Sequence, residues 1–185
     1  MALTPSNSIP LGTKAPDFRL RNTINDHMVS LEDIRGTKGT LVMFICNHCP
    51  YVKHINRELV RLSNDYHVTG FGIVAISSND AEAYPQDGPK EMRQNAIENR
   101  YPFPYLYDPT QEVAKAYDAA CTPDFYLFDN ELELVYHGQL DSSRPGNRIP
   151  VNGNDLRQAI DGILSNNPPV KVQKPSMGCN IKWKE

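Results

Sequence analysis

Two cysteines and a histidine lie close together in the segment MFICNHCPYVKHI, residues 43–55. Cys46 and Cys49 have the C-x-x-C spacing of a redox-active dithiol, and His48 stands directly before Cys49. A thiolate attacks disulfides and peroxides, and a neighbouring imidazole can stabilise it with a hydrogen bond or a charge. The segment therefore indicates thiol redox chemistry, although the same soft ligands could also bind a metal.

Cys49 is expected at the junction between a strand and a helix. Residues 39–46, GTLVMFIC, form a continuous apolar run, which predicts a strand buried on both faces. After Cys49, apolar residues recur at steps of three and four, which predicts a helix. Those residues are Val52, Ile55, Leu59, Leu62 and Tyr66. Pro50 is favoured at the first helical position, and the unsatisfied N–H groups there would bias Cys49 toward thiolate. Cys46 would then end the strand or begin the turn.

The rest of the pattern predicts strands that alternate with helices and then a hairpin. Further strands are expected near residues 18–20, 28–30, 70–77, 103–108, 124–129 and 132–140. Further helices are expected near residues 30–36, 89–99, 110–118 and 155–165, with Ser30 and Thr110 as N-caps of the first and third. This order predicts an α/β fold with a central mixed sheet and helices on both faces.

Length and composition favour one globular domain. The 185 residues suit a single core, which we expect over residues 1–166. Residues 167–185 have too much Pro and Lys for a core element, and we expect them to form a C-terminal tail that packs on or near the domain. A net charge of −3 gives no basic field for nucleic acid or an acidic membrane surface. The N-terminal segment has no signal-peptide pattern, and no apolar run approaches a membrane span, so a cytoplasmic location is expected.

Three segments resemble the redoxin superfamily of thioredoxin-fold proteins, in the branch of alkyl hydroperoxide reductase and thiol-specific antioxidant proteins. They are LGTKAPDFRL, LVMFICNHCPYVKHI and CTPDFYLFDNELELVYHG. The segments CNHCPYVKH, YPQDGP and PSMGCNIKWK further resemble a bacterial subgroup described only as thioredoxin family proteins. The resemblance implies a thioredoxin-like fold with an N-terminal extension and a C-terminal tail. It also implies a cis peptide bond before Pro123, with the backbone of Thr122 free to pair with an extended substrate beside Cys49 and Pro50.

The chain departs from both patterns that it resembles. Aligned on the thioredoxin motif, Cys49 falls on the attacking cysteine and Val52 falls on the second cysteine, so the visible C-x-x-C lies three residues too early. Aligned on the peroxiredoxin motif, Cys46 replaces the hydroxyl residue that orients the peroxide. The resemblance therefore implies an attacking Cys49 without the usual partner.

Three cysteines are candidates to resolve the intermediate on Cys49. Cys46 is the first choice because it is nearest in sequence, and its Cα should lie within disulfide range. Cys121 is the second, because the proline loop of this fold lies against the active-site cysteine. Cys179, on the C-terminal tail, is the third.

Two functions follow from these residues. The first is a thiol-dependent oxidoreductase without a cofactor or a bound metal, acting on protein or small-molecule disulfides or peroxides and recycled by a reducing thiol donor. The alternative is a Cu(I) or Zn²⁺-binding module that uses Cys46, His48 and Cys49, although a second pair of zinc ligands is not evident. A redox-inactive scaffold is a third, less specific interpretation.

Overall fold

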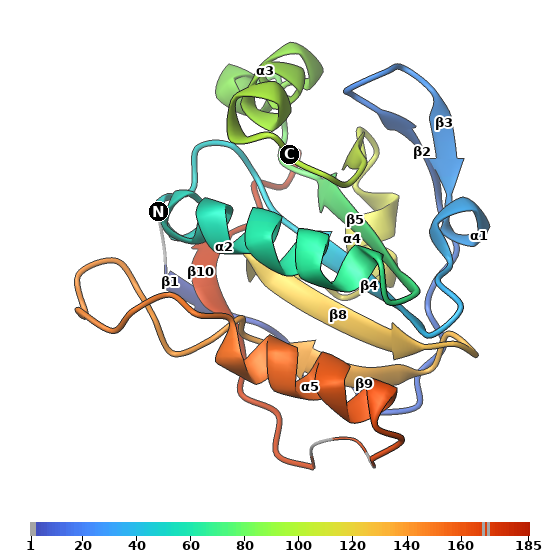
Figure 1. Ribbon diagram of the computed structural model, residues 1–185. Coiled ribbons are helices and arrows are strands. Elements are labelled where there is room, and N and C mark those ends of the chain that lie inside the picture. Colours follow the sequence, from blue (N-terminus) through green and yellow to red (C-terminus); the bar gives the residue numbers. More distant parts are fainter. Residues whose placement is uncertain (1–2, 168, 170) are drawn as a thin grey trace.

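The central sheet is mixed, as the sequence predicted. The computed structural model describes residues 3–167, 169 and 171–185 of the chain. Within these residues the sheet has the strand order β3-β2-β6-β5-β4-β8-β9 (Figure 1). The strands are β2 (Arg19–Asn22), β3 (Met28–Ser30), β4 (Gly39–Phe44), β5 (Phe71–Ser77), β6 (Tyr105–Tyr107), β8 (Asp124–Asp129) and β9 (Leu134–Gly138). Strand β4 pairs in parallel with β5 and antiparallel with β8, so it lies in the middle of the core.

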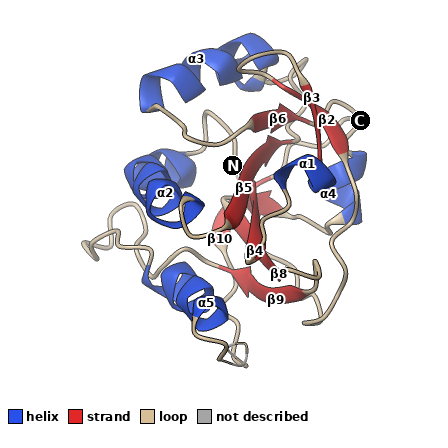
Figure 2. Ribbon diagram, turned by 45° about the vertical axis from the view of Figure 1, so that its right-hand side comes forward, coloured by secondary structure: helices blue, strands red, loops and turns tan. Residues whose placement is uncertain are grey.

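Helices cover both faces of this sheet (Figure 2). The helices are α1 (Leu31–Ile34), α2 (Pro50–His67), α3 (Pro89–Asn99), α4 (Glu112–Ala116) and α5 (Asn154–Leu164), with a 3-10 turn η1 (Pro85–Asp87) before α3. Alternate residues of β4 enter separate cores, since Leu41 and Met43 pack with residues of α2 and α5, whereas Val42 and Phe44 pack with residues of α1 and α4. Burial on both faces explains the continuous apolar run of β4.

The helix expected at residues 110–118 begins later than predicted. Thr110 does not cap it; the N-cap is Gln111, which has a positive φ of 62°. The buried carboxylate of Asp108 instead accepts a hydrogen bond from the backbone N–H of Ala114 at 3.0 Å. The Thr110 hydroxyl accepts only a long hydrogen bond, 3.4 Å, from the N–H of Glu112. The first turn of α4 is therefore held from a residue that precedes the helix by several positions.

A second, smaller sheet joins segments near the two ends of the chain to the residues that directly precede β8. Its order is β1 (Leu3–Pro5), β10 (Met177–Asn180) and β7 (Cys121–Thr122), and both pairings are antiparallel. The expectation that the tail holds no core element is wrong, because Cys179 and Ile181 are buried. Periodicity could not reveal β10, since the strand is only four residues long and its partners come from distant segments.

The described residues contain no helix that is both long and apolar enough to cross a membrane.

Candidate active site around Cys49

Cys49 is the N-cap residue of α2 and lies where β4 has just ended. Its backbone is extended, with φ −63° and ψ 121°, and Pro50 follows at the start of the helix. The N–H of Lys53 closes the first turn by donating to the Cys49 carbonyl at 3.0 Å. The Cys49 side chain is fully buried, and the positive end of the helix dipole acts directly on its sulfur.

The sulfur of Cys49 contacts the C-terminal strand. Its Sγ lies 3.0 Å from the Sγ of Cys179, which belongs to β10. In its thiol form Cys49 also donates to the backbone carbonyl of Thr122 at 3.3 Å. All four cysteines lie within the described residues, and no disulfide joins any of them there. Cys179 is therefore a thiol in contact with Cys49, and about 1 Å of further approach would bring the pair to the bonding distance of a disulfide.

The loop before β8 positions Cys179 next to Cys49. The Thr122–Pro123 peptide bond is cis, as the resemblance implied. In the pairing of β7 with β10, Thr122 lies opposite Cys179, and Cys121 lies opposite Asn180. The edge of β7 that was expected to receive an extended substrate is therefore paired with the chain's own β10.

Cys46 also lies next to Cys49, but its environment is that of a hydrogen-bond donor. Its Sγ lies 3.3 Å from Oγ1 of Thr122, and its side chain is almost fully buried. A hydrogen bond to Cys49 and burial together raise the pKa of Cys46 well above its ordinary value, and the carboxylate of Asp87 adds to this effect. Cys46 therefore keeps its proton and offers it to the neighbouring sulfur.

Cys49 is the thiolate of the group. The hydrogen bond from Cys46 is the largest influence and lowers the pKa of Cys49 to about 5, assisted by Cys179 and by the N–H of Val52, while burial opposes the shift. Burial and the contact with Cys49 raise the pKa of Cys179 to about 12. One negative charge is thus placed on Cys49, with two protonated thiols beside it.

Cys121 lies near this group but faces away from it. Thr122 directs its side chain at Cys46, and successive residues of a strand point to opposite faces. The Sγ of Cys121 instead lies 4.0 Å from the Pro123 carbonyl oxygen, and burial raises the pKa of this thiol. The structure thus brings Cys46, Cys49 and Cys179 together through Thr122 and leaves Cys121 outside that contact.

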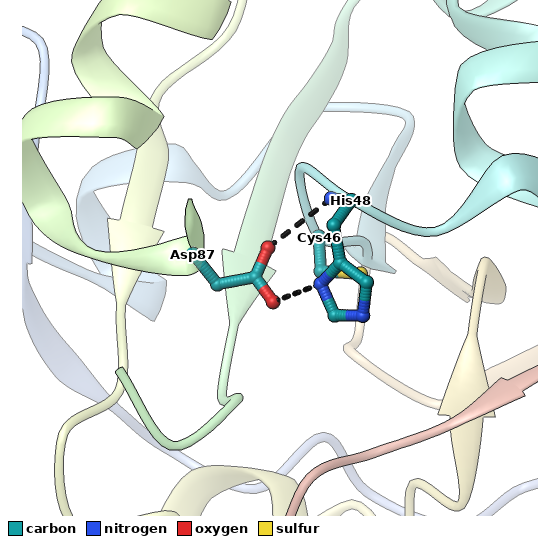
Figure 3. A group of neighbouring side chains, drawn as sticks. All are labelled: Cys46, His48 and Asp87. Carbon is teal, nitrogen blue, oxygen red and sulfur yellow. Dashed lines mark hydrogen bonds and ion pairs between the residues drawn. The ribbon is translucent and has the colours of Figure 1, made fainter. Parts of the chain in front are cut away.

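His48 binds a carboxylate rather than the Cys49 sulfur. Its Nδ1 lies 2.5 Å from Oδ2 of Asp87 (Figure 3). Its ring also stacks on that of Tyr84 at a centroid distance of 5.7 Å. Oδ1 of Asp87 also accepts the backbone N–H groups of Asn47 and His48 at 2.8 and 3.2 Å. Asp87 therefore fixes the turn between Cys46 and Cys49.

Asp87 and Asn79 are site residues that sequence reasoning missed. The side-chain amide of Asn79 donates to Oδ2 of Asp87 at 2.8 Å, and its oxygen Oδ1 accepts the backbone N–H of Lys182 at 2.9 Å. This pair of bonds connects the active-site turn to the C-terminal segment. Asp87 lies in the YPQDGP segment that carried part of the resemblance, so the sequence marked this segment as informative. Nothing in the sequence indicated the contact between Asp87 and His48, which lie 39 residues apart.

A metal site does not fit these residues well. Ligand atoms of Cys46, His48 and Asp87 lie within 4.8 Å of one another, a set that differs from the expected Cys46, His48 and Cys49. Both oxygens of Asp87 already accept hydrogen bonds from Asn47, His48 and Asn79. A metal ion bound to Asp87 would break these bonds, so metal binding by these residues is not favoured.

Comparison with known proteins agrees with this geometry. The model of the AhpC/TSA family matches residues 11–137, which include the strand, the Cys49 turn, α2 and the cis-proline loop. The chain belongs to the AhpC/TSA family. The matched residues end before β10, so Cys179 lies outside the part that the family model describes.

Solved structures show how far the similarity extends. An uncharacterized conserved protein from Geobacillus kaustophilus is 59% identical over 100% of this chain and 97% of its own, with a TM-score of 0.98. A hypothetical protein from Sinorhizobium meliloti is 47% identical over 98% of each chain, with a TM-score of 0.95. The thioredoxin domain of a thiol-disulfide oxidoreductase from Bacteroides vulgatus is 20% identical over 83% of this chain and 99% of that domain, with a TM-score of 0.62. That last likeness establishes the thioredoxin-like fold. No match was found among curated proteins.

Proposed function

We propose that this AhpC/TSA family protein is a thiol-dependent oxidoreductase in which Cys49 attacks and Cys179 resolves. The observation that carries the proposal is the 3.0 Å contact between the two sulfurs at the start of α2. The lowered pKa of Cys49 gives a nucleophilic thiolate near neutral pH. Because the pKa of Cys179 is raised, its thiol stays protonated and can supply a proton beside that thiolate.

With a hydroperoxide, the reaction has two steps. The Cys49 thiolate attacks the terminal peroxide oxygen, the O–O bond breaks, and the alcohol leaves after taking a proton, so that Cys49 becomes a sulfenic acid. The Cys179 thiol then attacks the Cys49 sulfur, the S–O bond breaks, and water leaves as the disulfide forms. An external dithiol reduces the disulfide and is itself oxidised.

With a disulfide substrate, the same two residues act in the same order. Cys49 attacks one substrate sulfur and releases the other as a thiolate, which leaves a mixed disulfide on Cys49. Cys179 attacks the Cys49 sulfur of that bond and releases the second substrate thiol.

Cys46 has a separate role in this proposal. Its proton stabilises the Cys49 thiolate, so Cys46 acts as a hydrogen-bond donor to Cys49 and not as the resolving residue. The Cys46 sulfur contacts the hydroxyl of Thr122, so a hydroxyl group reaches this part of the site from a different segment than in the usual peroxidase pattern.

The proposal is tested by counting thiols after oxidation. We expect one equivalent of hydrogen peroxide to remove two thiols from the wild-type protein, and to leave a sulfenic acid on Cys49 that dimedone traps in Cys179→Ser. Cys121→Ser is the matched control and should lose two thiols like the wild type. If neither hydrogen peroxide nor a small disulfide consumes Cys49, the protein is a redox-inactive member of the fold and the proposal is wrong.

A further inference from the structure

The C-terminal strand lies where an extended substrate would have to bind. Cys179 faces Thr122 across the β7–β10 ladder, and its sulfur points at Cys49. A cysteine-containing peptide that paired with the same edge of β7 and presented its sulfur to Cys49 would occupy the space of β10. The protein thus holds its own cysteine strand in the position of a peptide substrate.

The contact between β10 and β7 is too close to be shared with a second chain. Gly178 lies directly beside the cis-proline loop, and a Cβ atom added to it would come within 2.0 Å of the Thr122 carbonyl oxygen. The other edge of β10 is also paired, since Leu3, Thr4 and Pro5 of β1 lie opposite Cys179, Gly178 and Met177. An incoming strand therefore finds neither edge of β10 open within the described residues.

Hydrogen bonds hold β10 at both ends. Before the strand, the hydroxyl of Ser176 donates to the Gly138 carbonyl at 2.6 Å, and its N–H donates to the Ser6 hydroxyl at 3.0 Å. After the strand, the N–H of Ile181 donates to the Ala120 carbonyl at 3.1 Å. The next residue, Lys182, is held by Asn79 as described above. Releasing β10 would break these bonds and expose Ile181, which is 1% exposed, so release requires local unfolding.

We infer that β10 acts as a fixed selectivity element, which confines Cys49 to small oxidants and excludes extended peptide disulfides. This inference rests on the proposed function of Cys49 and Cys179. A small oxidant needs only side-chain fluctuations to reach a buried sulfur, whereas a peptide needs β10 to leave.

The test compares two oxidants on the full chain. The small probe is hydrogen peroxide. The large probe is a peptide of about ten residues, about 30 Å long when extended. Its single cysteine forms a mixed disulfide with thionitrobenzoate. The Cys49 thiolate would attack the peptide sulfur and release coloured thionitrobenzoate, which reports the rate. Mass spectrometry would then find either the peptide on Cys49 or the Cys49–Cys179 disulfide that forms when Cys179 releases the peptide thiol. We expect the ratio of the peptide rate to the peroxide rate to be about 100-fold lower for the wild-type protein than for free cysteine.

Two variants loosen β10 without changing any cysteine. Ser176→Ala removes one buried hydrogen bond and should increase the peptide rate about fivefold, because it raises the population of the open strand. Gly178→Ala should increase it further, because its Cβ cannot fit against Thr122. Gly162→Ala is the matched control, since nothing lies within 4 Å of its added Cβ, and both of its rates should equal those of the wild type. If Gly178→Ala does not fold, Ser176→Ala carries the test alone.

The outcomes separate the inference from the proposed function. Oxidation of Cys49 by hydrogen peroxide, slow peptide attachment and a selective gain in Ser176→Ala support the inference. Equal relative rates for both probes in the wild type would overturn it while leaving the proposed function intact. So would loosened variants in which the peptide rate increases no more than the peroxide rate does. A Cys49 that reacts with neither probe refutes both.

Discussion

The Sγ atoms of Cys49 and Cys179 lie 3.0 Å apart, although 130 residues separate them in the chain. The contact arises because Cys49 begins α2 beside the cis-proline loop, and Cys179 pairs with Thr122 of that same loop. The start of α2 and the strand β10 both approach the backbone carbonyl of Thr122, whose oxygen lies 3.3 Å from the Cys49 sulfur. A C-terminal residue is thereby placed in the candidate active site, at the junction of β4 and α2.

Removing the Cys46 hydrogen bond should raise the pKa of Cys49. In Cys46→Ala the largest stabilising influence on the thiolate is lost, so the pKa should rise from about 5 toward its ordinary value and the rate of alkylation at pH 6 should fall. Cys46→Ser keeps a donor and should show a smaller rise. Iodoacetamide alkylation followed by mass spectrometry measures both variants. Equal pKa values in the wild type and in Cys46→Ala would contradict the donor role.

Reactivity of Cys49 should change with pH below neutrality. A thiol with a pKa of about 5 is almost entirely thiolate at pH 7, so its alkylation rate should rise between pH 4 and 6 and then level off. The thiols of Cys46, Cys121 and Cys179 have raised pKa values and should stay unreactive over this range. A Cys49 rate that still increases between pH 8 and 9 would contradict the assignment of the thiolate.

The same pKa shift should appear in the stability of the reduced protein. Because the pKa of Cys49 is lower in the folded state than its ordinary value of 9.0, the thiolate contributes stability above pH 9, and this contribution is lost as the pH falls toward 5. The raised pKa of Cys179 acts in the opposite sense and removes stability as the pH rises from 9 to about 12. Urea unfolding of the wild type and of Cys49→Ser between pH 5 and 9 should show a smaller increase in the variant. Parallel curves would argue against a folded-state thiolate.

Asp87 should be essential for the structure of the active-site turn. Asp87→Asn replaces a fully buried carboxylate that accepts bonds from Asn47, His48 and Asn79, and we expect a loss of about 2–4 kcal/mol in the free energy of unfolding. Loss of the charge should also lower the pKa of Cys46, which Asp87 raises. Glu82→Gln, at an exposed position nearby, is the control and should change stability by less than about 0.5 kcal/mol. An Asp87→Asn variant as stable as the control would contradict this role.

The sequence was informative where local patterns decide the structure. The apolar run of β4, the three-and-four spacing of α2 and the proline after Cys49 together predicted the strand–helix junction, and each is a property of neighbouring residues. The tail carried no such signal. The burial of Cys179 depends on pairing with Leu3 and Thr122, which are distant in the chain, and on glycine at 178, where a Cβ would meet the Thr122 carbonyl. Sequence proximity therefore favoured Cys46 as the resolving residue, whereas the described contacts favour Cys179.

Disulfide mapping tests the central claim most directly. The reduced wild-type protein would be oxidised with one equivalent of hydrogen peroxide, blocked with an alkylating reagent, digested without reduction and sequenced by mass spectrometry. The account predicts a cross-linked pair of peptides that joins Cys49 to Cys179, with Cys46 and Cys121 alkylated after unfolding. A disulfide between Cys46 and Cys49, or between Cys49 and Cys121, would contradict it.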